Sequence, residues 1–174
     1  DDDSVGYALE TQTRPVYSRV PSESTVAHEL AHQWLGNAVS PQRWQDIWLN
    51  EGWATYLSWL WLEENGGATA QTQFDAVMSI PDTSPFWAIV VADPGSFGIF
   101  SDPVYDRGAA TLVALRSKIG DDDFFAGARA WLSTYDDADG TTEDFQQIYE
   151  QASGQDLSEF FDIWLRDPVK PTVW

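Results

Sequence analysis

Apolar residues recur with helical spacing along most of this chain, in segments separated by turn-forming residues. The first segment begins at Ser22, a suitable N-cap, and reaches a stop signal at Gly36-Asn37. The pattern predicts six further helices, at residues 44–64, 68–80, 105–119, 121–135, 142–152 and 157–166. Only residues 5–11 alternate in a way that favours a strand, and that strand is short.

The segment from Trp44 to Glu64 has apolar residues on nearly all sides of its helix, so we expect it to be largely buried. Residues 82–103 are instead rich in Pro, Gly, Asp and Ser, which is typical of a long loop that is functional or poorly ordered. The aspartate-rich residues 1–3 and 136–139 predict solvated linkers. Thr141 and Asp144 predict a capping box.

Composition narrows the possible partners. Of 174 residues, 43% are hydrophobic and ten are tryptophan, which suits one mainly α-helical domain with a core. The net charge of −19 would repel nucleic acid and anionic membrane surfaces, and no run of 18 apolar residues could span a bilayer. The first residues do not resemble a signal peptide, so secreted and cytoplasmic locations both stay open. Because cysteine is absent, a metal would need histidine and carboxylate ligands.

The only two histidines lie four residues apart in the sequence HELAH. Four residues are about one helical turn, so His28 and His32 project from the same face and can bind one zinc ion. Glu29 lies about a quarter turn away, where it can reach water at the metal and act as a general base. The alternative is an exposed helix face that carries two ordinary histidines.

A catalytic zinc ion of this type has three protein ligands, so a third must come from elsewhere in the chain. Glu51 is the candidate, because burying a carboxylate in so apolar a helix costs free energy unless a cation binds to it. The alternative is a surface glutamate on a half-exposed helix.

The sequence HELAH, followed by eighteen residues between His32 and Glu51, and the sequence NEGWA around Glu51 resemble the gluzincin zinc aminopeptidases related to aminopeptidase N. The resemblance covers nearly the whole chain. It implies one Zn²⁺ per chain, held by His28, His32 and Glu51, with Glu29 as the base. It also implies that residues 1–174 are the helical part of a thermolysin-like catalytic domain, with a short amino-terminal strand and without the family's upstream sheet and β domain.

Two further motifs depend on this resemblance. Residues 6–10, GYALE, resemble the family's glycine-x-alanine-methionine-glutamate-asparagine motif, with Leu9 in the methionine place and Thr11 in the asparagine place. Glu10 would then bind the substrate's free amino terminus. Tyr105, two residues before Arg107-Gly108, resembles the tyrosine that stabilises the oxyanion in relatives. Without the resemblance, Glu10 would be interpreted as a solvated strand residue and Tyr105 as a packing residue.

The sequence therefore predicts a zinc aminopeptidase that acts on peptides with a free amino terminus. A thermolysin-like endopeptidase could use the same zinc site. A non-catalytic interaction domain could also retain the metal for stability, although a structural zinc ion has no need of Glu29.

Overall fold

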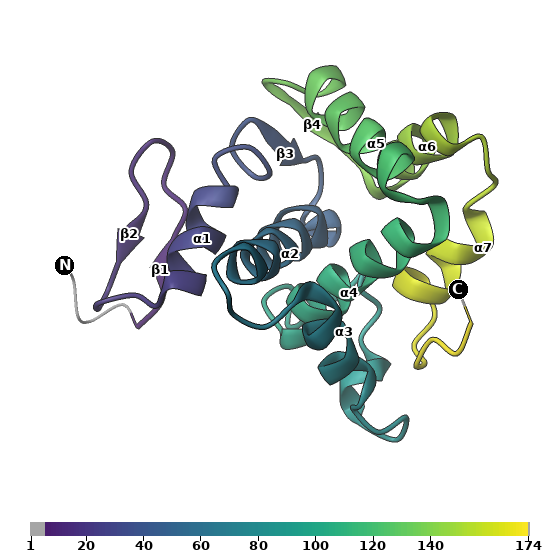
Figure 1. The fold of residues 1–174 in the computed structure, drawn as a ribbon, viewed down its shortest axis with the longest axis horizontal. Coiled ribbons are helices and arrows are strands. Elements are labelled where there is room, and N and C mark those ends of the chain that lie inside the picture. Colours follow the sequence, from purple (N-terminus) through teal and green to yellow (C-terminus); the bar gives the residue numbers. More distant parts are fainter. Residues whose placement is uncertain (1–5, 174) are drawn as a thin grey trace.

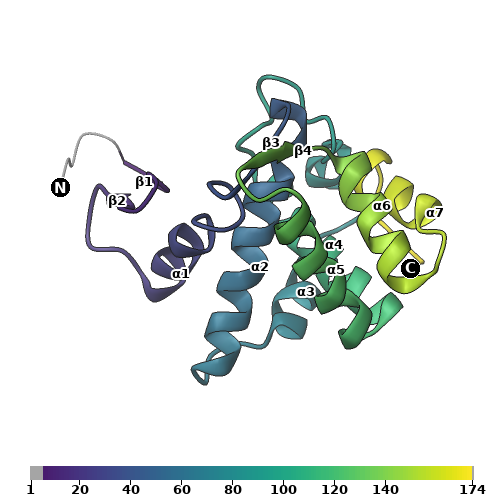
Figure 2. The ribbon, with the colours of Figure 1, turned by 90° about the horizontal axis from the view of Figure 1, so that it is seen from above.

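Two long helices, α2 (Trp48–Glu64) and α4 (Asp102–Ile119), lie side by side at the centre of the computed structural model, which describes residues 6–173 (Figures 1 and 2). Residues 48–56 of α2 are all buried, which confirms the expectation from its apolar pattern. The final turn is exposed at Trp61, so the burial does not extend to the end of the helix. The predicted stop at Asn65-Gly66-Gly67 is confirmed.

Helix α1 (Glu23–Ala31) packs beside α2 and starts at Ser22, whose hydroxyl accepts a hydrogen bond from Thr25 N at 3.0 Å. The prediction that this helix continues to Gly36-Asn37 is wrong. After Ala31 the chain makes turns that lead into Gly36, whose φ of +143° favours glycine. The early end matters because it brings the Leu35 carbonyl back to the His32 ring.

The second half of the chain is also helical, as predicted (Figure 1). Rings of Phe124, Trp131, Phe145 and Tyr149 from this half pack with Trp53 of α2, at centroid distances of 4.6–6.2 Å. The capping box at Thr141 and Asp144 is present. The remaining helices are α3 (Ala70–Met78), α5 (Asp121–Thr134), α6 (Thr142–Ser153), α7 (Ser158–Phe161) and the short 3-10 or π helices η1 (Trp44–Asp46), η2 (Pro85–Ala88) and η3 (Asp162–Arg166).

Short strands join distant parts of the chain. The predicted strand at residues 5–11 is reduced to β1 (Ala8–Leu9), which pairs antiparallel with β2 (Val16–Tyr17); Val5 and the linker at residues 1–3 lie outside the described residues. Strand β3 (Val39–Pro41) pairs in parallel with β4 (Ala138–Gly140). The prediction of a solvated linker at residues 136–139 is therefore wrong for the backbone, although those side chains are exposed.

The mainly α-helical fold class is thus confirmed. Among residues 6–173, no helix combines the length and the apolar character needed to cross a membrane.

Candidate metal centre

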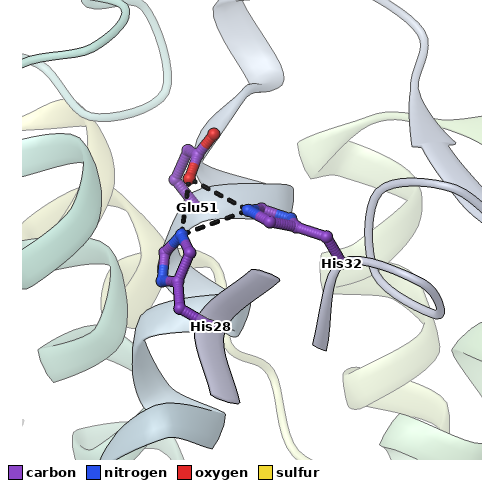
Figure 3. Close-up of side chains that lie close together, drawn as sticks. All are labelled: His28, His32 and Glu51. Atoms are coloured by element: carbon purple, nitrogen blue, oxygen red, sulfur yellow. Dashed lines mark hydrogen bonds and ion pairs between the residues drawn. The ribbon is translucent and has the colours of Figure 1, made fainter. Parts of the chain in front are cut away.

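The side chains of His28, His32 and Glu51 converge at the place where α1 lies against α2 (Figure 3). His28 Nε2 lies 3.1 Å from His32 Nε2 and 3.2 Å from Glu51 Oε2. The third side of the triangle, from His32 Nε2 to the same oxygen, is 3.3 Å. Glu51 is 6% exposed and His32 is 1% exposed, so the predicted burial of Glu51 is observed.

The triangle has the dimensions of a zinc site. Two ligand atoms about 2.0–2.1 Å from a tetrahedral ion lie about 3.3 Å from each other. The three measured separations of 3.1–3.3 Å are close to that value. Two imidazoles and one carboxylate are also the donor set that zinc accepts, so the residues present fit a metal ion.

The protonation of His32 suits ligation. Its Nδ1 lies 3.1 Å from the carbonyl oxygen of Leu35, and a carbonyl can only accept a hydrogen bond. In the neutral ring Nδ1 therefore carries the proton, which leaves the lone pair of Nε2 directed into the triangle. His28 has a weaker outer contact, since its Nδ1 lies 3.5 Å from Thr55 Oγ1.

The electrostatics of the metal-free cluster are those of a buried ion pair. Burial favours the neutral form of Glu51, but hydrogen bonds from His28 and His32 outweigh it and lower the pKa of Glu51 to about 2. Burial favours neutral His32, whereas its hydrogen bond with Glu51 and the charge of that carboxylate leave the pKa of His32 raised. A cation in the triangle would replace the proton in this pairing.

Glu29 also lies in this cleft and is 7% exposed. Burial raises the pKa of Glu29, while His28 and His32 oppose the shift and the carboxylates of Glu10 and Glu51 add to it. A carboxylate with a raised pKa is better suited to exchange a proton near neutral pH than an ordinary glutamate.

Tyr105 lies in the first turn of α4, and its ring stacks on that of His28 with a centroid distance of 6.0 Å and an interplanar angle of 25°. Burial and the neighbouring carboxylates, Glu51 first among them, raise the pKa of Tyr105. The phenol therefore keeps its proton and can donate it in a hydrogen bond.

Glu10 follows β1 and lines the same cleft. Its backbone carbonyl accepts hydrogen bonds from Asn37 Nδ2 at 3.0 Å and Gln33 Nε2 at 3.3 Å. These contacts tie the end of β1 to the segment that follows α1. All six residues predicted for the site thus line one cleft of about 1020 Å³, namely Glu10, His28, Glu29, His32, Glu51 and Tyr105.

Three contributors to the site were not predicted from the sequence, namely Thr55, the Leu35 carbonyl and Asn50. Thr55 lies one helical turn after Glu51, which indicates that it is near the site. That spacing alone does not identify His28 as its partner. The Leu35 carbonyl could not be predicted, because every residue has a carbonyl and only the turn after α1 brings this one to His32. Asn50, also left out, lines the cleft.

Two imidazoles one helical turn apart and a buried carboxylate from a second helix, gathered beside a cleft, form the donor set typical of zinc peptidases. The model of the peptidase family M1 domain matches residues 7–164. The chain therefore belongs to peptidase family M1.

Several relatives are similar over almost the whole chain. A probable aminopeptidase 2 from Sulfurisphaera tokodaii is 31% identical over 95% of this chain and 22% of its own length. Aminopeptidase N from Lactococcus lactis is 29% identical over 95% of this chain and 21% of its own. The chain thus spans about a fifth of the length of these curated relatives.

Solved structures agree in fold. The M1 zinc metallopeptidase from Deinococcus radiodurans has a TM-score of 0.79 and 29% identity, over 96% of this chain and 37% of its own. A mutant of that protein was solved with a Tyr-Ser-Ala substrate and also has a TM-score of 0.79, at 28% identity over 96% of this chain and 38% of its own.

Proposed function

We propose that this chain is the zinc-binding catalytic subdomain of an aminopeptidase, which hydrolyses the first peptide bond of substrates with a free amino terminus. The observation that carries the proposal is the triangle of donor atoms from His28, His32 and Glu51 beside the cleft. Its dimensions support one Zn²⁺ per chain. The names of the M1 relatives, which are aminopeptidases and zinc metallopeptidases, support the same function.

A bound zinc ion would supply Lewis acidity and lower the pKa of water at the site. Glu29 is proposed to take the proton from the attacking water and later to deliver it to the leaving amine. Its low exposure supports this role, because a buried carboxylate accepts a proton more readily than a solvated one.

Tyr105 is proposed to donate a hydrogen bond to the oxygen that becomes negative when the carbonyl is attacked. The stacking of its ring on that of His28, one of the three ligand residues, supports this role. Its raised pKa supports a role as donor, because the hydroxyl stays protonated.

Glu10 is proposed to bind the ammonium group of the substrate. An ion pair with a fixed carboxylate would orient the first peptide bond and exclude blocked peptides. The two hydrogen bonds that hold the Glu10 backbone support this role, because they fix where its side chain starts.

The test compares one tetrapeptide with a free amino terminus and the same peptide acetylated, using the full-length zinc-loaded protein. We expect cleavage of the free peptide alone, after its first residue. In Glu10→Ala we expect kcat/KM to fall by at least about 100-fold while the zinc content stays unchanged, a size typical of lost positioning. Glu64→Ala, at the exposed end of α2, is the matched control and should leave both values unchanged.

Each alternative has its own outcome. Equal cleavage of both peptides would contradict the proposal and indicate an endopeptidase. No cleavage of either peptide by the zinc-loaded protein would indicate a metal-binding interaction domain.

A further inference from the structure

Helices α2 and α4 touch through two glycines next to the metal centre. Gly52 directly follows Glu51, and Gly108 lies one helical turn after Tyr105. A methyl group added to Gly108 would lie 3.0 Å from Gly52 Cα, and one added to Gly52 would lie 3.0 Å from Gly108 Cα and C. Both separations are shorter than the usual carbon–carbon contact of about 3.5–4.0 Å.

Neither glycine is needed for its backbone conformation, because both lie inside helices with negative φ. Alanine is the better helix former at such positions. What both positions exclude is a side chain, and the opposing atoms are helix backbone that cannot rotate aside. The same contact is closed on a third side by Trp48, whose Cε3 would lie 3.3 Å from a methyl group on Gly52.

This contact joins the helix that carries Tyr105 to the helix that carries Glu51. Residues three apart on a helix are neighbours on its surface, so Tyr105 moves with Gly108. Glu51 is bonded to Gly52, and α1, which carries His28 and ends next to His32, packs on α2. A change in the α2–α4 separation therefore moves the phenol relative to the triangle without moving the three ligands relative to one another.

We infer that Gly52 and Gly108 are positioning residues, which let α4 approach α2 closely enough for Tyr105 to act at the metal centre. The inference rests on the proposed role of Tyr105. Alanine at either position forces the helices apart by part of an ångström, and a displacement of about 1 Å can lower a rate by roughly 100-fold.

The experiment is a double-mutant cycle between Gly108→Ala and Tyr105→Phe in the full-length zinc-loaded protein. Gly108→Ala should lower kcat by about 10- to 100-fold with little change in KM or zinc content. In the Tyr105→Phe background the same substitution should lower kcat by less than about threefold, because the hydroxyl that it displaces is already gone. Calorimetric binding of a phosphinic dipeptide analogue, whose tetrahedral centre resembles the oxyanion, should weaken in parallel.

Gly127→Ala is the matched control, because its methyl group would lie 2.6 Å from the Tyr149 ring, away from the metal centre. It should lower the melting temperature but leave kcat unchanged. Gly52→Ala crowds the same α2–α4 contact from the other side and should repeat the effect of Gly108→Ala.

The outcomes separate two failures. If Tyr105→Phe leaves kcat unchanged, the proposed role of Tyr105 fails, and the positioning inference fails with it. If Tyr105→Phe lowers kcat but Gly108→Ala does not, or if the loss from Gly108→Ala persists in the Tyr105→Phe background, only the positioning inference is overturned. Failure of both glycine variants to fold at 10 °C would also overturn it, because the contact would then serve folding alone.

Discussion

The metal centre and the surroundings of Arg107 both bury charged groups, and they satisfy them in different ways. At the metal centre, His28, His32 and Glu51 have one another as partners, and their three donor atoms meet at one point. In the second half of the chain, Arg107 is fully buried and donates to the backbone carbonyls of Trp87, Ile89, Ile163 and Asp167 at 2.7–3.4 Å.

The difference separates a ligand site from a structural clamp. Burial lowers the pKa of Arg107 to about 10, although the charge of Asp167 opposes the shift, so the guanidinium stays charged at neutral pH. Its partners are neutral carbonyls of η2, η3 and the segments that follow them, which leaves no role for an added ion. In the triangle every partner can ionise, so a cation can replace the shared proton.

The largest expected effect is loss of a ligand. Glu51→Ala should lower zinc affinity by more than the roughly 10- to 100-fold that loss of an outer partner costs, and it should abolish hydrolysis. Metal analysis after dialysis against a chelator measures this directly. Normal zinc content in Glu51→Ala would remove Glu51 from the site; Glu64→Ala serves as the control.

Glu29→Gln should lower kcat by about 10²- to 10⁴-fold and leave zinc stoichiometry unchanged, because the amide keeps the shape of the side chain but cannot act as a base. Turnover and metal content are measured on the same sample. Loss of zinc in this variant would show instead that Glu29 is a ligand or a folding residue.

Arg107→Met should lower the stability of the protein without changing its zinc binding. Removing the guanidinium leaves buried carbonyls unsatisfied, so the free energy of unfolding should fall by about 2–4 kcal/mol. Zinc affinity of the folded protein should not change. Urea denaturation measures the loss, with Arg129→Met, at an exposed position of α5, as the control. Equal stability of the two variants would contradict the clamp.

The pH dependence of stability should separate the metal-free and zinc-loaded proteins. Without metal, the pKa of Glu51 falls from 4.5 to about 2, so its contribution is present above pH 4.5 and is lost as the pH falls toward 2. The pKa of His32 is raised, so its contribution is present below its ordinary value of 6.5 and is lost as the pH rises through the raised value.

Zinc requires neutral imidazoles, so the stabilisation that it adds should grow as the pH rises from about 6 to 8. Thermal denaturation should be measured across this range with and without zinc. As the pH rises, the pairing of His32 should contribute less to the melting temperature of the protein without zinc, whereas the increase in melting temperature caused by zinc should become larger. A zinc-induced increase in melting temperature that is the same at pH 6 and pH 8 would contradict ligation by the histidines.

The features of the fold and the site that can be predicted from the sequence are those set by local spacing. His28 and His32 share a helix face because they are four residues apart, and the burial of Glu51 follows from the apolar residues around it. The pairing of β3 with β4 joins residues about 100 positions apart, and no local period encodes it. Arg107 was predicted only as part of a motif, because its burial depends on carbonyls supplied by distant segments.

The most direct test of the metal centre is a crystal structure of the zinc-loaded protein with anomalous scattering data collected at the zinc edge. We expect one anomalous peak per chain, about 2.0–2.2 Å from His28 Nε2, His32 Nε2 and a Glu51 carboxylate oxygen. A zinc-loaded crystal whose anomalous peak lies elsewhere, or in which Glu51 does not contact the ion, would contradict it.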